Sequence, residues 1–332
     1  MSVREMLEQR ENEYLSPLAA RSGEATRARE EDECDMRTAF QRDRDRILHC
    51  NSFRRLKRKT QVFLSPEGDH YRTRLTHTLE VSQIARSMAR ALSLNEDLAE
   101  AAALGHDLGH TPFGHAGERA LREVCPHGFN HYEQSVRVVT TLEKMGRGLN
   151  LTDQTVDAIG HHSGEIWAQT LEGQIVRYAD KIAYVNHDID DAIRGGVLEN
   201  GDVPFEIAEV LGGNSRQRLD TMIRAVVEES RGKNSIEMEK TVKNAHAELM
   251  RFMFDNVYIS SAAKVEEKKA EEIVKSLYNH FVSHPEQMPE EYQLIIEREG
   301  VTRAACDYIS GMTDNYAVSK YSELYLPAFW MK

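Results

Sequence analysis

Apolar and small residues recur at three- and four-residue steps along most of this chain, and no other feature constrains its fold as strongly. The clearest run lies between Tyr71 and Leu94, where the repeating positions are Leu75, Leu79, Ser82, Ala85, Met88, Ala89 and Leu92. This period places the repeated side chains on one face of a helix. Little period-two alternation, which would indicate strands, occurs beyond Val62 to Leu64. The sequence therefore predicts an all-α fold.

The same period predicts helices along the rest of the chain. We expect them over residues 71–94, 96–104, 118–124, 132–145, 153–161, 172–193, 205–211, 216–230, 235–256 and 263–282, with a basic helical segment over 42–61 and further helix after Pro285. Asn95 is a typical N-cap residue for the second of these helices. Residues 62–68 predict a short strand or turn that closes at a Pro-Glu-Gly sequence.

Composition excludes several classes of protein. The net charge of −12 argues against general adhesion to nucleic acid or to an anionic membrane. No apolar run approaches the roughly 18 residues that span a bilayer, and residues 1–10 lack the apolar segment of a secretory signal. The four cysteines are scattered without a CxxC pair, so neither a zinc knuckle nor a disulfide framework is indicated. We therefore expect a cytoplasmic protein.

One basic segment stands out from this acidic background. Residues 42–59 contain eight arginines or lysines against two aspartates, a local excess of +6. Such a segment favours one anionic ligand at one place, although a solvated helix face has the same composition.

The stretch from Leu104 to Glu118 concentrates the side chains that carry chemistry. It holds three histidines, two carboxylates and four glycines, directly after a mostly apolar run. His106 and Asp107 are adjacent, so they point about 100° apart on a helix and cannot share one face. They can still converge on an ion held just beyond the helix end.

Two further residues complete a candidate metal site. His77 lies on the apolar side of the helix expected over residues 71–94, where a core histidine is the plainer interpretation. Asp180 lies within an apolar helix, where a carboxylate is costly unless it is paired or metal-bound. Together His77, His106, Asp107 and Asp180 form an imidazole and carboxylate set without thiolates. That set suits a divalent Mn, Mg, Fe, Co or Ni ion with open positions better than a structural zinc.

This pattern of ligands on separate helices resembles the HD-domain phosphohydrolase superfamily. The surrounding motifs resemble its bacterial deoxyguanosinetriphosphate triphosphohydrolase-like family over about residues 10–200, and they are RDRDRILH (42–49), FRRL (53–56), KTQVF (59–63), RTRLTH (72–77), HDLGHTPFGHAGE (106–118) and ADKIAY (179–184). The resemblance implies an HD-domain helical bundle with additional C-terminal helices. It also implies metal-dependent hydrolysis of deoxynucleoside triphosphates, dGTP and other dNTPs, to deoxynucleoside and inorganic tripolyphosphate.

His115 and Glu118 are the strongest acid–base candidates. They are three residues apart, so on a helical turn the carboxylate can orient the imidazole. The resemblance places this pair at the family's catalytic positions, whereas the alternative is that His115 only caps a glycine-rich turn. By resemblance His131 would face the α-phosphate, although a plain helix-start residue is nearly as good an interpretation. His110 could line the same wall, and at most one of the adjacent His161 and His162 can point inward.

Substrate contacts can be assigned in part from spacing. Arg74 precedes His77 by about one helical turn, so it should project toward the same site. Asp180, Tyr184 and Asp188 recur at four-residue steps and share one helix face.

The resemblance adds roles to these substrate contacts. It implies that Lys181 contacts phosphate and that Tyr184 packs against C2′ of the sugar. It also implies that Asp188 and Gln61 bind the 3′-hydroxyl, whereas a surface acid beside other aspartates is the alternative for Asp188.

Two other functions fit the same motifs. An HD-type nucleotide phosphodiesterase or 5′-nucleotidase would use the four ligands but leave His115, Glu118, Tyr184 and Asp188 without roles. A non-catalytic nucleotide-binding regulator would keep the metal only for stability.

We expect two regions of the chain and several partners. Residues 1–200 would form the HD core with an N-terminal phosphate-binding segment, and residues 201–332 a helical C-terminal region packed on the core and in oligomer contacts. Shorter relatives imply a homo-oligomer, a tetramer or hexamer, and some imply a dNTP activator. Single-stranded DNA as a partner is not indicated, and no membrane association is expected.

Overall fold

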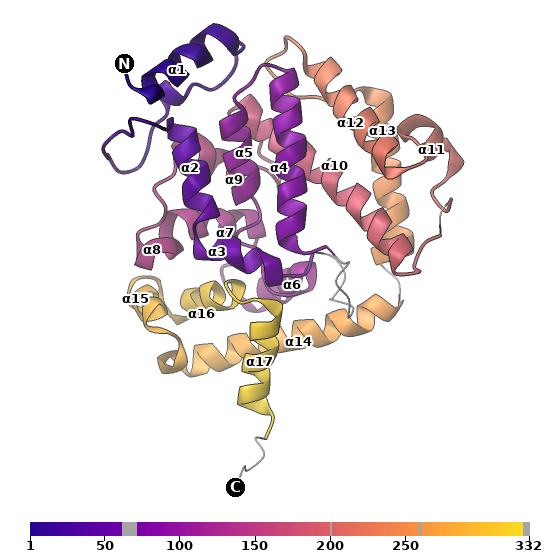
Figure 1. The fold of residues 1–332 in the computed structure, drawn as a ribbon. Coiled ribbons are helices and arrows are strands. Elements are labelled where there is room, and N and C mark those ends of the chain that lie inside the picture. Colours follow the sequence, from indigo (N-terminus) through magenta and orange to yellow (C-terminus); the bar gives the residue numbers. More distant parts are fainter. Residues whose placement is uncertain (62–71, 200, 259–260, 328–332) are drawn as a thin grey trace. The chain divides into compact units, whose positions relative to one another are not determined.

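The structure is a computed structural model that describes residues 1–61, 72–199, 201–258 and 261–327. Its elements are helices (Figure 1), and over these residues β-structure is limited to two isolated bridges, Arg27 with Thr152 and Thr60 with Thr73. The predicted all-α fold is therefore confirmed. The turn predicted over residues 62–68 lies outside the described residues.

Contacts between residues divide the chain into two compact units that interleave along the sequence. The first unit comprises residues 1–49, 76–106 and 149–260, and the second comprises residues 50–75, 107–148 and 261–332. The predicted division of the chain at residue 200 stays a prediction.

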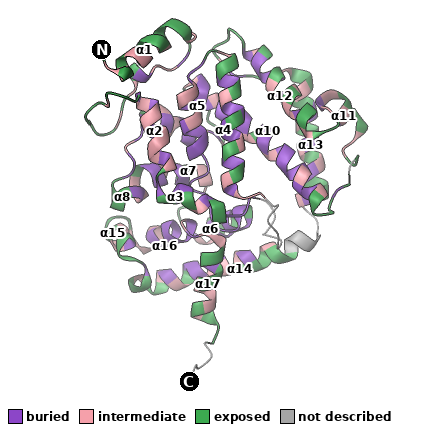
Figure 2. Cartoon of the chain, viewed as in Figure 1, coloured by how far each residue is buried: buried purple, intermediate pink, exposed green. Residues whose placement is uncertain are grey.

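The first unit is built around two long helices and the apolar helix that leads to the histidine-rich stretch. Its elements are α1 (Val3–Tyr14), α2 (Ala39–Leu48), α4 (Arg74–Ala91, from residue 76), α5 (Glu96–Gly105), α9 (Asp153–Gly160), α10 (Leu171–Arg194), α11 (Phe205–Leu211), α12 (Ser215–Ser230) and α13 (Lys240–Met253). Helix α5 packs against α2, α9 and α10, and Figure 2 shows it largely buried.

Helix α5 begins and ends where its sequence dictates. Asn95 accepts hydrogen bonds from the backbone N–H groups of Asp97 and Leu98, as a side-chain N-cap. At the other end Gly105 packs against Ile159 so closely that a Cβ atom would lie 2.4 Å from the Ile159 Cδ1 atom. A larger residue at this position would require the Ile159 side chain to move, so glycine lets the end of α5 pack closely against α9.

The second unit is organised along α14 (Ser261–Ser283). This helix packs against α6 (Gly114–Val124), α16 (Val301–Ser310) and α17 (Asp314–Tyr325), and the other helices are α3 (Asn51–Arg55), α7 (His131–Arg137), α8 (Glu143–Gly146) and α15 (Glu290–Glu299). Its core joins residues of α6, such as Leu121, to Val274 and Phe281 of α14 and Ile309 of α16.

Four predicted helical segments differ from those observed. The basic segment expected over residues 42–61 is divided between α2, α3 and a 3-10 turn at Leu56–Arg58. The helix expected from Glu118 already begins at Gly114, after Phe113 in a left-handed conformation (φ 62°). The helix expected over 132–145 is interrupted by a π-helical turn at Val138–Leu142. The helix expected from residue 235 begins at Lys240, because the Glu239 side chain caps it by accepting from the Val242 N–H group. Periodicity does not register such caps and bulges, since they leave the apolar spacing almost unchanged.

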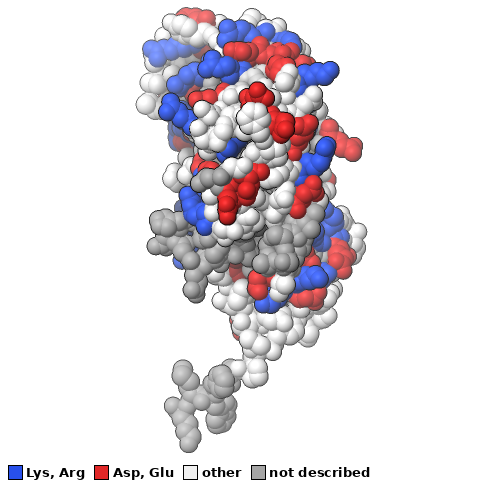
Figure 3. Space-filling view, turned by 90° about the vertical axis from the view of Figure 1, so that its right-hand side faces the viewer, with Lys and Arg blue, Asp and Glu red and all other residues white. Residues whose placement is uncertain are grey.

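Two observations concern the surface and the helices of the described residues. Figure 3 shows basic and acidic side chains interspersed over the described part of the face in view. Among the helices of the described residues, none combines the length and apolarity needed to cross a membrane.

Candidate metal centre and histidine cluster

The first unit gathers two histidines and an aspartate where α5 ends. His106 is the C-cap residue of α5 and is fully buried. Its Nδ1 atom lies 2.6 Å from the Ala103 carbonyl oxygen, and His162 makes the equivalent contact of 2.7 Å to the Ile159 carbonyl oxygen. Each Nδ1–H group therefore donates to the backbone, and in the neutral tautomer that this contact selects each Nε2 atom carries the lone pair. The ligand atoms of His106, His162 and Asp180 lie within 4.8 Å of one another.

His77 joins this cluster from α4. Its Nε2 atom lies 3.1 Å from Asp180 Oδ1, and His106 Nε2 lies 3.7 Å from the same oxygen. Burial alone would raise the pKa of Asp180, but the hydrogen bond from His77 and the nearby His106 and His162 hold that pKa below its usual range. The carboxylate is therefore ionised and surrounded by imidazole nitrogens, a donor set that fits a divalent cation.

Three of the four predicted ligands thus lie together within the first unit, and His162 joins them. Of the adjacent pair, His161 instead contacts Asp157 at 2.8 Å within its own helix. The sequence could have indicated His162 as a ligand candidate by its position, because it follows the C-terminus of α9 much as His106 follows that of α5. Asp107 belongs by its contacts to the second unit, but one peptide bond joins it to His106.

In the second unit Asp107 is held by a buried arginine. Arg74 Nη1 donates to Asp107 Oδ2 at 2.6 Å, and His110 Nε2 lies 3.3 Å from the other oxygen. Ligand atoms of Asp107, His110 and His131 lie within 4.8 Å of one another. Burial and the positive charge of Arg74 hold the pKa of His110 well below its usual range, so this imidazole stays neutral. Gly114 makes room for Arg74, since a Cβ atom there would lie 3.3 Å from Arg74 Nη2.

Glu118 links two histidines in the same unit. Its Oε1 atom accepts from the His131 backbone N–H group at 3.1 Å and lies 3.2 Å from His131 Nδ1, while Oε2 lies 3.6 Å from His115 Nδ1. Burial would raise the pKa of Glu118, but hydrogen bonds with His115 and His131 hold it below its usual range. His110 stacks on His131 with ring centroids 4.1 Å apart. The side chain of His115 is 49% exposed, so solvent reaches it.

The predicted sugar-binding residues are distributed over both units. Asp188 is 1% exposed, so it is not a surface acid, and it accepts a hydrogen bond from the Tyr258 hydroxyl. The Tyr184 and Tyr258 ring centroids lie 6.1 Å apart. Lys181, the predicted phosphate contact on the same helix, is exposed. Gln61 belongs to the second unit, where it is buried and its backbone carbonyl oxygen accepts a hydrogen bond from Arg74 Nη2 at 3.2 Å.

Sequence reasoning missed Tyr258. The residue lies in the π-helical turn Phe254–Tyr258, and 70 positions separate it from Asp188. The helix expected over residues 235–256 ends two residues before Tyr258, and no motif in the sequence connects Tyr258 with Asp188.

The basic segment over residues 42–59 is largely engaged within the protein. Arg42 and Arg46 pair with Glu31, and Arg44 pairs with Asp97. In the second unit Lys59 is buried and donates to the carbonyl oxygens of His110 and Ser310. Three of the eight basic side chains thus pair with acids that lie elsewhere in the sequence, whereas Arg54, Lys57 and Arg58 are exposed.

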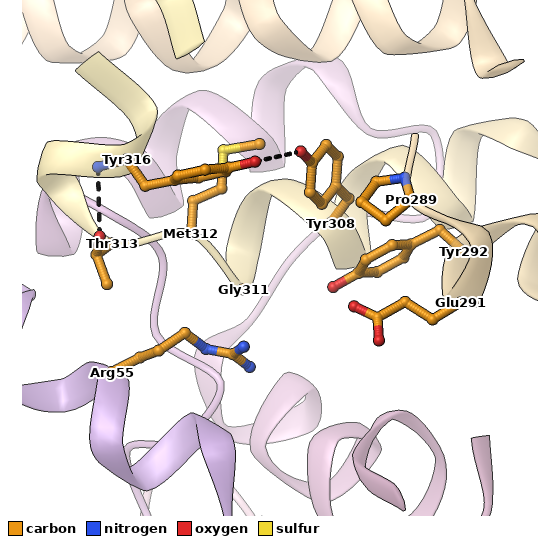
Figure 4. Close-up of a pocket in the computed structure, with 9 residues that line it drawn as sticks. All are labelled: Arg55, Pro289, Glu291, Tyr292, Tyr308, Gly311, Met312, Thr313 and Tyr316. Carbon is orange, nitrogen blue, oxygen red and sulfur yellow. Dashed lines mark hydrogen bonds between the residues drawn. The ribbon is translucent and has the colours of Figure 1, made fainter. Parts of the chain in front are cut away.

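Arg55, from the same basic segment, lines a cavity of about 350 Å³ in the second unit. Figure 4 shows its side chain opposite three tyrosines, Tyr292, Tyr308 and Tyr316, and the Tyr308 and Tyr316 hydroxyl groups lie 2.9 Å apart. None of the predicted site residues lines this cavity.

Two family models match the chain. The HD domain matches residues 74–185, and the phosphohydrolase-associated domain matches residues 236–323. The chain is 56% identical to a deoxyguanosinetriphosphate triphosphohydrolase-like protein of Caldanaerobacter subterraneus subsp. tengcongensis, over 100% of the chain and 98% of that protein. It is 48% identical to a protein of the same description from Clostridium perfringens, over the whole of both.

Solved structures show the fold. A phosphohydrolase from Bacteroides thetaiotaomicron matches with a TM-score of 0.54 at 17% identity, over 85% of this chain and 67% of that one. A hypothetical protein from Aquifex aeolicus matches with a TM-score of 0.51 at 18% identity, over 84% of this chain and 67% of that one.

Proposed function

Because the chain belongs to the deoxyguanosinetriphosphate triphosphohydrolase-like family, we propose that it hydrolyses dGTP and other deoxynucleoside triphosphates to deoxynucleoside and inorganic tripolyphosphate. HD domains bind divalent metal ions, so the reaction would require one. The native ion would be Mn, Mg, Fe, Co or Ni, which accept imidazole and carboxylate ligands together.

The observation that carries this proposal is the buried, thiolate-free cluster of the first unit. His77 and His106 direct Nε2 atoms at the Asp180 carboxylate, at 3.1 and 3.7 Å. Asp107 would be the fourth ligand, because consecutive Cα atoms are about 3.8 Å apart and the residue cannot lie far from His106. Once bound, the ion would lower the pKa of a bound water molecule and polarise a phosphoryl oxygen.

The histidine cluster of the second unit would handle protons and phosphate. Because His115 Nδ1 faces Glu118, that carboxylate would hold the proton on Nδ1 and leave Nε2 as the atom that exchanges a proton with the substrate. Displacement of O5′ from the α-phosphorus needs a proton on the leaving oxygen, and His115 Nε2 would supply it. His131 would bind the α-phosphate, with Glu118 fixing its orientation in the same way.

Phosphate-binding and sugar-binding residues would complete the substrate site. Arg74 and Lys181 would contact phosphate oxygens as cations, and His110 would do so as a neutral hydrogen-bond donor. Tyr184 would pack against C2′ and exclude a ribose 2′-hydroxyl, and Asp188 and Gln61 would bind the 3′-hydroxyl. The Tyr258 hydroxyl supports this role for Asp188, because its hydrogen bond fixes the carboxylate.

Product analysis tests the proposal directly. Metal-free and Mn-loaded protein are each incubated with the four dNTPs and with GTP, and the products are resolved by ion-exchange chromatography. Deoxynucleoside plus tripolyphosphate, formed only with metal, is the expected result. Monophosphate or free phosphate would favour the phosphodiesterase or 5′-nucleotidase, and nucleotide binding without turnover would favour the regulator. Dependence on a mixture of dNTPs would support an activator site, and light scattering of the same samples would give the size of the proposed homo-oligomer.

A further inference from the structure

A second histidine and a glutamate stand behind His77, and the motifs give neither of them a role. His187 lies on α10, seven residues after Asp180, so the two residues share a face of the helix. Its Nδ1 atom lies 3.5 Å from His77 Nδ1, and the two rings are nearly perpendicular (89°). On its other side His187 Nε2 contacts the carboxylate of Glu80, which follows His77 by three residues on α4.

These contacts fix the proton on each ring if His77 binds a metal ion. His77 Nε2 faces Asp180, so this atom must present its lone pair to the ion and the ring proton must reside on Nδ1. That proton can only be shared with His187 if His187 Nδ1 carries a lone pair. The proton of His187 then resides on Nε2, which faces the Glu80 carboxylate. Each protonated nitrogen in this series therefore faces a group that can accept its proton.

We propose that His187 and Glu80 are positioning residues for His77, and that they fix its tautomer and ring orientation for metal binding. This inference rests on the proposed function, since it requires that His77 is a metal ligand. An outer carboxylate that accepts a proton from a ligating imidazole makes that imidazole a stronger donor to the metal. Here His187 would transmit the effect, because it lies between Glu80 and His77.

The surroundings of His187 argue against a packing role alone. The residue is buried on α10, where an apolar side chain would need no hydrogen-bond partner. A buried imidazole needs hydrogen-bond partners to offset the loss of water. The partners of this imidazole are a candidate metal ligand on one side and a carboxylate on the other.

The test is metal affinity, measured by isothermal titration of the metal-free protein with MnCl₂. His187→Phe keeps a planar ring but removes the acceptor for His77 Nδ1–H, and we expect Mn affinity to fall about ten- to a hundredfold. Glu80→Ala should lower it about tenfold. Glu80→Gln should lose less Mn affinity than Glu80→Ala, because the amide oxygen can still accept a hydrogen bond from His187. The Co²⁺-loaded variants should also show an altered visible absorption spectrum, since the ligand field at the ion changes when the His77 ring is no longer held.

A matched control separates this role from a structural one. Glu100→Gln removes a carboxylate of the same unit that pairs with Arg44 and Arg86, and it should leave Mn affinity unchanged. Thermal unfolding of each metal-free variant reports stability separately. If His187→Phe does not fold, Glu80→Ala decides the question alone, because that side chain is 38% exposed and tolerates truncation.

The two proposals fail in different ways. Wild-type Mn affinity in both His187→Phe and Glu80→Ala would overturn the positioning role while wild-type binding and hydrolysis still support the proposed function. A wild-type protein that binds no divalent ion would overturn the proposed function, and the positioning role with it.

Discussion

The two histidine clusters differ in what holds their imidazoles. In the first unit, backbone carbonyl oxygens accept from the Nδ1 atoms of His106 and His162, and these two histidines are nearly inaccessible to solvent. In the second unit, a carboxylate contacts the Nδ1 atoms of His115 and His131, and the His115 side chain is half exposed. A carbonyl fixes one tautomer and adds no charge, whereas a carboxylate also stabilises a protonated ring. The first arrangement suits metal ligands, and the second suits groups that change protonation.

The largest expected effect comes from removing a ligand in the first cluster. His106→Ala should abolish Mn binding and nucleotide hydrolysis together, because it removes a fully buried Nε2 ligand from the cluster. Metal content after dialysis, measured by mass spectrometry, and tripolyphosphate release check both effects. His284→Ala, which removes an exposed histidine, is the control and should bind Mn normally. Retention of stoichiometric Mn by His106→Ala would contradict the ligand assignment.

A change in the second cluster should separate chemistry from metal binding. His115→Ala should keep the metal and the fold, because the side chain is half exposed and contacts only Glu118 among the ion pairs described. Its kcat should fall about 10²- to 10⁴-fold, the usual contribution of a general acid. Steady-state kinetics at saturating Mn, together with metal content, provides the measurement. Unchanged turnover would show that His115 has no catalytic role. It would also contradict the distinction between a metal-binding first cluster and a proton-transferring second cluster.

The sequence predicted the parts of the site that depend on short-range order. His106 and Asp107 were found because an apolar helix ends directly before them, and His77 and Asp180 because each is polar on an apolar helical face. The sequence did not reveal Tyr258, His187 or Glu80 as partners, since each acts through a residue that tertiary packing brings to it. The ion pairs of the basic segment are another example, because Glu31 and Asp97 are close to Arg46 and Arg44 only in the folded chain.

The fold shows the same limit. Apolar spacing gave the existence of nearly every helix, because burial of one face is its main determinant. It did not give the start of α6, which depends on the left-handed conformation of Phe113, or that of α13, which depends on a side-chain cap by Glu239. Both features are single-residue events that the apolar period does not record.

Low pH should reduce the contribution that Glu118 of the second cluster makes to the stability of the folded protein. The pKa of Glu118 in the folded protein lies below the ordinary value of 4.5, so the folded state stays ionised while the unfolded state takes up a proton near pH 4.5. The stabilisation is therefore fully present above that pH and is lost as the pH falls through and below it. Compared with Glu118→Gln, the wild type should be more stable by about 1–3 kcal/mol at pH 7.

Urea unfolding of both proteins at pH 7 and pH 4 provides the measurement. The difference in unfolding free energy between them should shrink at the lower pH. A difference that stays constant would mean that the carboxylate charge contributes nothing to the cluster.

The smallest expected effect concerns Tyr258, which extends the comparison to the sugar-binding residues of the first unit. Tyr258→Phe removes the hydroxyl that donates to Asp188 and leaves the ring against Tyr184. A hydrogen bond to a buried carboxylate contributes about 1.5–3 kcal/mol of stabilisation. Part of the stabilisation that Asp188 loses in Tyr258→Phe is restored when the substrate 3′-hydroxyl donates to the same carboxylate. The KM for a dNTP should therefore rise only a few-fold, with kcat almost unchanged, because the chemistry lies at the phosphate.

A substrate without a 3′-hydroxyl sharpens this last prediction. The wild type should discriminate between a dNTP and its 2′,3′-dideoxy analogue through Asp188, and Tyr258→Phe should reduce that ratio because the carboxylate is no longer fixed. Tyr14→Phe changes an exposed tyrosine of the first helix and should leave the ratio intact. If Tyr258→Phe and Tyr14→Phe give the same ratio as the wild type, the Tyr258 hydroxyl does not position Asp188 for the 3′-hydroxyl. Tyr258 would then serve only to satisfy a buried carboxylate, as the backbone carbonyls do for the imidazoles of the first cluster.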